Sequence, residues 1–197
     1  MTARRVTVVL AALIVAVVAV LPALRSGAAG PDGPEAGFAR DMSTHHAQAV
    51  RMALTVRDRT RDTAVRTLAY DIATTQSQQI GMMTAWLDRW GAPKTDPRGP
   101  MRWMSHEGHA GRAAGAQAMP GMATPAQLAA LERASGRDAE VLFLRLMIVH
   151  HRAGVEMARA VLVRTGDEQV QRLARTMVRG QQAEIALMTD MLRQRGA

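Results

Sequence analysis

Histidine and methionine are the side chains of this sequence whose spacing could do chemistry. All six histidines of the 197-residue chain fall into close pairs: His45-His46, His106-x-x-His109 and His150-His151. Eight of the methionines accompany these pairs: Met42, Met52, Met101, Met104, Met119, Met122, Met147 and Met157. Imidazole and thioether groups are copper ligands, and thioether sulfur selects Cu(I). Because the chain has no cysteine, thiolate metal sites and disulfides are excluded. The pattern therefore predicts copper binding, with Cu(I) favoured and Cu(II) an alternative.

The doublets fall on predicted helices, and about 100° of rotation per residue places them on the helix surface. With Met42 at zero, His46 lies at about 40° and Ala53 at about 20°, within the apolar stripe. His45 lies at about 300°, beside Met52 at about 280°. The two histidines therefore flank the buried stripe, each with a methionine on its side. The doublet at 150–151 repeats this arrangement.

These residues also have structural explanations. Methionine on a buried stripe usually fills gaps in a core, and a histidine there is often a hydrogen-bonded structural group. Gln76 and Gln181 fall on the buried faces of the helices that follow the doublets, where an amide needs partners. We expect either a structural network around these glutamines or a role in orienting the histidines.

An internal repeat supplies the elements that position the doublets. Segment 38–92 aligns with 143–197 without a gap, and 22 of the 55 aligned residues are identical. Each copy predicts a helical hairpin, with helices at about 38–59 and 63–90 in the first copy. Asp62 is the predicted N-cap of the second helix in that copy, and Asp167 is its equivalent in the other. A lone hairpin leaves its apolar stripe exposed, whereas two hairpins packed together bury it. The predicted fold is an all-α four-helix bundle over 36–197.

The linker between the repeats, 93–136, differs in composition. It holds five prolines and several glycines, which indicates mostly loop. Thr124 followed by Pro125 predicts the start of a short helix with a capping box. We expect Gly136 to end that helix.

Composition and charge exclude other classes. Aromatic residues make up only 3% of the chain, too few for a β-sandwich or barrel. The net charge of +8 is spread out, with +1 over 1–37, +2 over 38–92, +1 over 93–142 and +4 over 143–197. We therefore expect a solvated helix surface and no nucleic-acid partner, with an anionic partner such as lipid headgroups as the alternative.

The N-terminal segment indicates the compartment. Arg4 and Arg5 precede an uncharged run over 6–24, which is long enough to span a bilayer. Small residues follow at 26–29 and could form a cleavage site. Residues 1–30 are therefore predicted to be a signal peptide or a membrane anchor. In either case the rest of the chain is expected outside the cytoplasmic membrane, as a periplasmic, secreted or anchored protein.

Three stretches of the sequence carry a family resemblance. They are Phe143-Leu-Arg-Leu-Met-Ile-Val-His-His-Arg-Ala-Gly-Val-Glu-Met-Ala, Met119-Pro-Gly-Met ahead of Thr124-Pro-Ala-Gln-Leu, and Asp41-Met-Ser-Thr-His-His. Together they resemble the family catalogued as domain of unknown function 305. The resemblance implies a ferritin-like helical bundle, usually exported, and copper binding through methionine and histidine, as in some extracytoplasmic members. The family's motifs map onto Met42, His45, His46, Met52, Met147, His150, His151 and Met157. One departure is Gln79, where the second copy has Glu184, so a role that needs a carboxylate can exist only in the second half.

Three functions compete. The leading prediction is an exported metal-binding protein, not an enzyme, that serves copper buffering, trafficking or resistance. Its partners would be the metal ion, a copper donor or acceptor protein, and the cytoplasmic membrane if the N-terminal segment is uncleaved. The alternative is a structural or partner-binding bundle whose core histidines hold no metal. A di-iron enzyme is disfavoured, because 38–92 lacks glutamate and the chain contains no Glu-x-x-His motif.

Overall fold

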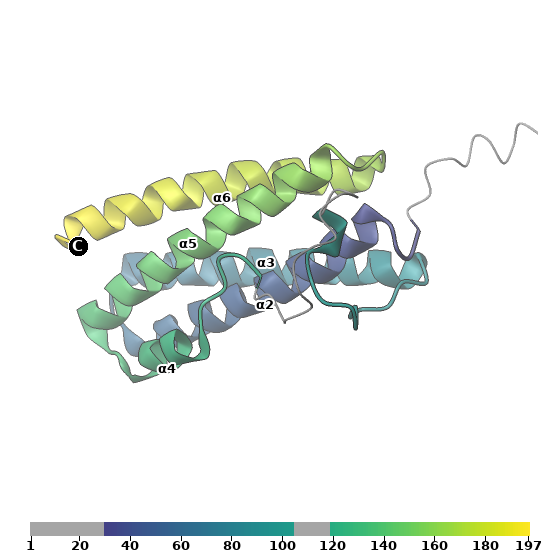
Figure 1. Ribbon diagram of the computed structural model, residues 1–197. Helices are drawn as coiled ribbons and strands as arrows, with labels where there is room; N and C mark the ends of the chain where they lie inside the picture. The colour runs from purple at the N-terminus through teal and green to yellow at the C-terminus, as the bar shows by residue number, and fades with distance from the viewer. Residues whose placement is uncertain (1–29, 105–118) are drawn as a thin grey trace, which may run out of the picture.

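The computed structural model of the protein describes residues 30–104 and 119–197 (Figure 1). Every regular element in these two ranges is helical, which confirms the all-α prediction. The elements are α2 (Pro34–Arg59), α3 (Thr63–Arg89), the 3-10 helix η1 (Arg102–Met104), α4 (Pro125–Arg133), α5 (Gly136–Leu162) and α6 (Glu168–Gln194). Among the described helices, none combines the length and the hydropathy needed to cross a membrane. The predicted N-terminal signal or anchor lies outside the described residues, apart from Gly30, and the domain boundaries stay a prediction.

Two helical hairpins, α2–α3 and α5–α6, build the bundle and meet through α2 and α5 (Figure 1). These two helices run in opposite directions, and the short α4 packs against both. Because the hairpins are copies of one repeat, equivalent residues of α2 and α5 come to face each other across this interface. The doublets therefore lie on α2 and α5, the first helix of each hairpin and the two helices that pack against each other.

Helix ends follow most of the predicted capping residues. Asp62 caps α3 and Asp167 caps α6, and each carboxylate accepts hydrogen bonds from backbone N–H groups of the first turn. Thr124 forms the predicted capping box at the start of α4. The prediction that Gly136 ends α4 is wrong, because α4 ends at Arg133 and Gly136 begins α5. Its left-handed backbone, with φ of 53°, makes the turn between these helices, a conformation that favours glycine.

The apolar core has two clusters, one on each side of the doublets. One cluster takes Met42 from α2 and Met157 from α5. The other takes Met52 from α2 and Met147 from α5. Along both helices the doublet lies between residues of the two clusters. Antiparallel packing of a repeat thus brings the histidines to the middle of the bundle.

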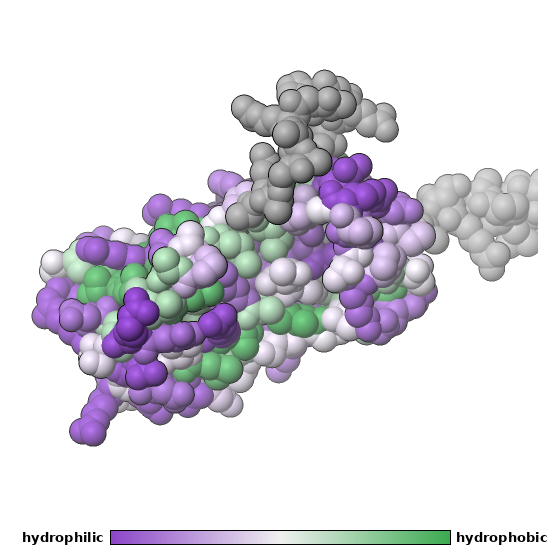
Figure 2. All heavy atoms as spheres, turned by 60° about the horizontal axis from the view of Figure 1, so that its bottom comes forward, coloured by the Kyte–Doolittle hydropathy of each residue, from purple (hydrophilic) through white to green (hydrophobic). Residues whose placement is uncertain are grey.

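Ion pairs join several of the described segments to one another. Arg98 pairs with Asp32 and Asp96, and Arg195 pairs with Asp62 and Glu140. The face seen in Figure 2 mixes hydrophilic residues with smaller apolar patches.

Candidate metal centre

The two histidine doublets meet where α2 and α5 cross. The rings of His45 and His150 are stacked, with centroids 3.6 Å apart and planes inclined by 30°. The Nε2 atom of His150 also lies 2.9 Å from the backbone carbonyl oxygen of His45, to which it donates. His46 and His151 flank this stack at 6.4 Å and 6.2 Å from their neighbours in sequence. All four side chains are fully buried or 1% exposed. The predicted doublets therefore form one cluster of four imidazoles.

Burial keeps most of these rings uncharged. Desolvation, reinforced by neighbouring imidazoles, lowers the pKa of His45 to about 4 and that of His46 to about 3. The same two causes hold the pKa of His150 well below its ordinary value of 6.5. The backbone of Pro120 raises the pKa of His45 and so offsets part of this lowering. At neutral pH these three rings are neutral, so each has one unprotonated nitrogen, the form that binds a metal ion.

The outer rings are oriented by residues of the second helix of each hairpin. The Nε2 atom of His46 lies 2.7 Å from Gln79 Oε1, and the Nε2 atom of His151 lies 2.8 Å from Glu184 Oε2. Since both acceptors are oxygens, each Nε2 nitrogen donates to its partner, and Nδ1 is the second nitrogen of each ring. Neither Nδ1 atom has a hydrogen-bond partner in the described part of the chain. This is the arrangement in which an outer partner fixes the tautomer of a metal-ligating histidine.

His45 is the most unusual of the four. It is 0% exposed, and among the described residues neither of its ring nitrogens forms a hydrogen bond of normal geometry. A buried polar atom without a partner costs about 1–3 kcal/mol. Counting both nitrogens of His45, four ring nitrogens of the cluster lack a partner within these ranges.

Sulfur donors lie on both sides of the imidazoles. Met42, Met52, Met147 and Met157 are 0–1% exposed, and the two core clusters place Met42 with Met157 and Met52 with Met147. The structure thus brings the eight family-matched residues into one region of the bundle. Burial of this kind is also typical of methionines that fill gaps in a core.

The Met119–Met122 turn covers the histidine crossing. Gly121, with φ of 77°, packs against α5 so closely that a Cβ atom there would lie 2.5 Å from Ala153 Cβ. Two hydrogen bonds, of 2.6 and 3.0 Å, join the side chain of Gln48 to the backbone of Ala123, the residue that follows the turn. Met119 is buried and Met122 is half-buried. The predicted linker pair therefore lies next to the cluster.

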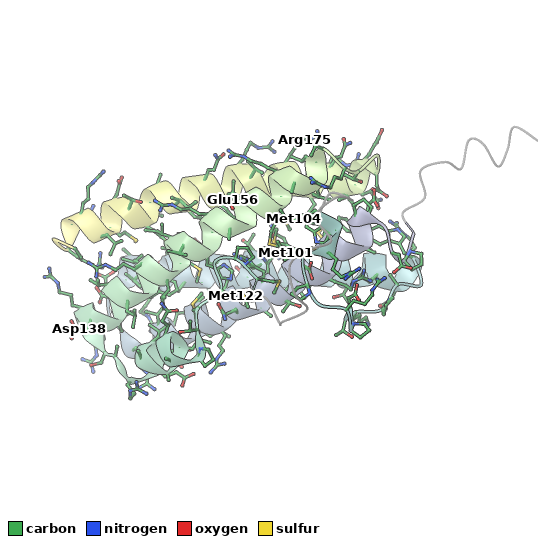
Figure 3. All side chains as sticks on the ribbon, viewed as in Figure 1. Met101, Met104, Met122, Asp138, Glu156 and Arg175 are labelled. Atoms are coloured by element: carbon green, nitrogen blue, oxygen red, sulfur yellow. The ribbon has the colours of Figure 1, made fainter. Side chains whose placement is uncertain are left out.

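The other linker methionines lie beside the core cluster that contains Met42. Met101 and Met104 are half-buried and pack against that apolar cluster (Figure 3). Asp41 on α2 anchors their segment, because its Oδ2 accepts from Met101 N at 2.7 Å and from Trp103 Nε1 at 2.8 Å. The predicted pair His106 and His109 lies outside the described residues.

The glutamines singled out in the sequence lie on the buried helix faces, as predicted. Gln76 and Gln181 are buried, but the residues that hydrogen-bond the histidines are Gln79 and Glu184, one helical turn further on. The Oε1 atoms of Gln76 and Gln181 have no partner in the described ranges. Gln79 and Glu184 each lie three residues after a buried glutamine, and this helical spacing could have identified them as the partners of the histidines.

The donors fit a soft metal ion better than a hard one. Within the described residues, no group of three or more histidine and carboxylate side chains is arranged to hold an ion alone. The donors that the described residues offer at the doublets are imidazole nitrogen and, in the adjoining core clusters, thioether sulfur. That mixture suits copper, whereas zinc prefers a closed set of nitrogen, oxygen or thiolate ligands.

Comparison with known proteins identifies the family. Residues 35–192 match the family described as Domain of unknown function (DUF305). This chain belongs to the DUF305 family. A Streptomyces coelicolor structure named "putative secreted protein DUF305" is 51% identical, with a TM-score of 0.77 over 84% of this chain and 96% of that one. A DUF305 fragment from Deinococcus radiodurans is 37% identical, with a TM-score of 0.67 over 82% and 96%.

The DUF305 fold is shared with a copper-bound structure. CopM in the Cu(I)-bound form is 23% identical to this DUF305 chain, with a TM-score of 0.63 over 82% of this chain and 96% of CopM. At that identity the likeness shows the fold. A search of the curated proteins found no match.

Proposed function

We propose that this DUF305 protein binds copper, Cu(I) foremost and Cu(II) as well, outside the cytoplasmic membrane. It serves copper buffering, trafficking or resistance and does not act as an enzyme. The holding residues are the two doublets, the four methionines around them and the linker methionines, with His106 and His109 as further candidates. Its partners are the metal ion and a copper donor or acceptor protein.

One observation carries this proposal. Buried imidazoles with unpaired ring nitrogens lie between two pairs of buried methionines at the α2–α5 crossing. A histidine that only stabilises a core is expected to satisfy both ring nitrogens or to be replaced by an apolar residue. Orphaned lone pairs beside thioethers are instead what a copper ion would complete.

The relatives support the same proposal. CopM has been crystallised in Cu(I)-bound, Cu(II)-bound and Ag-bound forms, and the Cu(II)-bound form is 27% identical to this chain, with a TM-score of 0.59. The Streptomyces coelicolor relative is named as secreted, which supports an extracytoplasmic place for this chain. The uncharged N-terminal run supports it independently and adds the membrane as a partner if it is retained.

The test is a competition titration of the purified protein with Cu(I), with Ag(I) and Zn(II) in parallel. We expect tight, stoichiometric Cu(I) and Ag(I) binding and weaker Zn(II) binding. Replacing Met42 and Met157 by leucine removes sulfur at nearly constant volume, so the fold should persist while Cu(I) affinity falls tenfold or more. The matched control replaces Met83 and Met188, which are buried in the same two core clusters but lie on α3 and α6, the helices without a histidine doublet.

Two results would reject the proposal. Wild-type affinity for Cu(I) weaker than about micromolar, roughly −8 kcal/mol, would favour the structural or partner-binding bundle. Equal Cu(I) affinities for the two leucine double variants would show that the methionines beside the doublets only fill the core.

A further inference from the structure

The centre has two halves, His45-His46 with Gln79 and His150-His151 with Glu184, and the acceptor that holds the outer histidine differs between them. His46 and His151 are equivalent in the repeat, and so are Gln79 and Glu184, at the same separation of 33 residues. Both acceptors approach Nε2 at nearly the same distance, 2.7 and 2.8 Å. The same hydrogen bond therefore ends on a neutral amide in one half and on a carboxylate in the other.

The carboxylate is not neutralised by another partner. Among the described residues, Glu184 hydrogen-bonds His151 and forms no ion pair with an arginine or lysine. Its side chain is only 25% exposed, so solvent screens its charge incompletely. The half that contains His46 has no equivalent, because segment 38–92 contains no glutamate.

A carboxylate that accepts from one ring nitrogen makes the other nitrogen a stronger electron donor and adds a negative charge to its surroundings. Both effects favour a cation of higher charge. An amide acceptor orients the ring equally well but adds no net charge, so it leaves the choice of metal to the ligands themselves.

We propose that the two half-sites are inequivalent: Glu184 makes the His151 half the stronger site for Cu(II), whereas Gln79 leaves the His46 half a neutral site that favours Cu(I). Glu184 and Gln79 are thus positioning residues that set which oxidation state each half holds. This inference rests on the proposed copper binding and adds the specificity of each half to it.

The exchange of the two residues tests the proposal, since glutamine and glutamate have the same shape. Cu(I) and Cu(II) affinities are measured by competition titration for wild type, Glu184→Gln, Gln79→Glu and the double exchange. We expect Glu184→Gln to lower Cu(II) affinity by about 10- to 100-fold, the usual effect of losing an outer partner. Its Cu(I) affinity should change by less than about threefold, a small part of that effect. Gln79→Glu should strengthen Cu(II) binding at the first half, and the double exchange should restore the wild-type preference.

Two further measurements separate charge from structure. Glu156→Gln is the matched control, because Glu156 is exposed on α5 and the substitution removes the same charge. In the metal-free, nitrogen-15-labelled protein, the proton on Nε2 of His151 should resonate further downfield than the proton on Nε2 of His46. Glu184→Gln should abolish that difference without any copper present.

The outcomes are distinct. Wild type that binds neither ion overturns copper binding and the inequivalence together. Wild type that binds both ions, with Glu184→Gln no different from Glu156→Gln, overturns the inequivalence alone. A loss of Cu(I) and Cu(II) affinity by the same factor would also overturn it, because the carboxylate would then only orient the ring.

Discussion

Acid should unfold the metal-free protein through its buried histidines. Unfolding frees His45, His46 and His150 to bind protons with an ordinary pKa of 6.5, whereas in the folded protein burial lowers the first two pKa values to about 4 and about 3 and the third well below 6.5. Between these limits the unfolded chain binds more protons, so the free energy of unfolding falls as pH falls. The stability is fully present above pH 6.5 and is lost as pH drops toward the folded pKa values.

The magnitude follows from the three sites. Each histidine contributes a slope of about 1.4 kcal/mol per pH unit within its window. From pH 7 to pH 5, His45 and His46 each cost about 2 kcal/mol, or about 4 kcal/mol together, and His150 adds a loss of the same sign. Small domains have about 5–15 kcal/mol of total stability, so the transition should fall near or below pH 5. Burial raises the pKa of Asp41, which has the opposite sign and reduces the slope only at the acid end.

Urea unfolding at several pH values, followed by far-UV circular dichroism with a chelator present, measures this slope. His45→Leu removes one of the three protons and should reduce the slope by about one third. Bound copper competes with protons for the same nitrogens and should move the transition to lower pH. A free energy of unfolding that changes by less than about 1 kcal/mol between pH 7 and pH 5 would refute the reasoning, since fully buried neutral histidines cannot give a flat profile.

Two further predictions concern residues around the centre. Gly37→Ala should destabilise the fold by about 1–3 kcal/mol in urea unfolding, because its Cβ would lie 2.6 Å from Trp103 Cβ. The control Gly180→Ala meets open space on an exposed helix face and should be neutral or stabilising by up to about 1 kcal/mol, so equal effects would contradict the packing argument. Asp41→Ala leaves two donors of the 101–104 segment without an acceptor and should cost about 1–3 kcal/mol. Hydrogen exchange should be faster across that segment, and an unchanged exchange rate would show that its apolar packing alone holds it in place.

The repeat made most of the fold predictable from the sequence. Gap-free alignment and apolar periodicity fixed the helix type and number in each copy, and Asp62, Thr124 and Asp167 marked three helix starts because short polar side chains cap orphan N–H groups. The end of α4 escaped prediction, since a glycine in left-handed conformation serves equally at a helix end or in a turn between helices.

The site was predictable in composition but only partly in geometry. A helical wheel places His46 on the buried arc, yet it contains no information about which helix crosses which. The stack of His45 on His150 depends on the antiparallel meeting of α2 and α5, a tertiary fact. The partners of the outer rings were missed by one turn, because Gln76 and Gln79 both face inward and only three-dimensional packing selects which one reaches the imidazole.

The energetics of the centre argue against a purely structural role. A core does not need a histidine at position 45. A leucine there would bury more apolar surface, would not take up a proton in acid and would leave no buried nitrogen without a partner. The chain instead holds buried imidazoles that lower its stability in acid and leave four ring nitrogens without partners in the described ranges. Proteins accept such local cost where function requires it. Copper binding would return the lost stability through ligation, since an ion that binds only the folded state stabilises it in proportion to its affinity and concentration. The unpaired nitrogens that destabilise the metal-free bundle would therefore make the stability of the protein depend on the copper concentration.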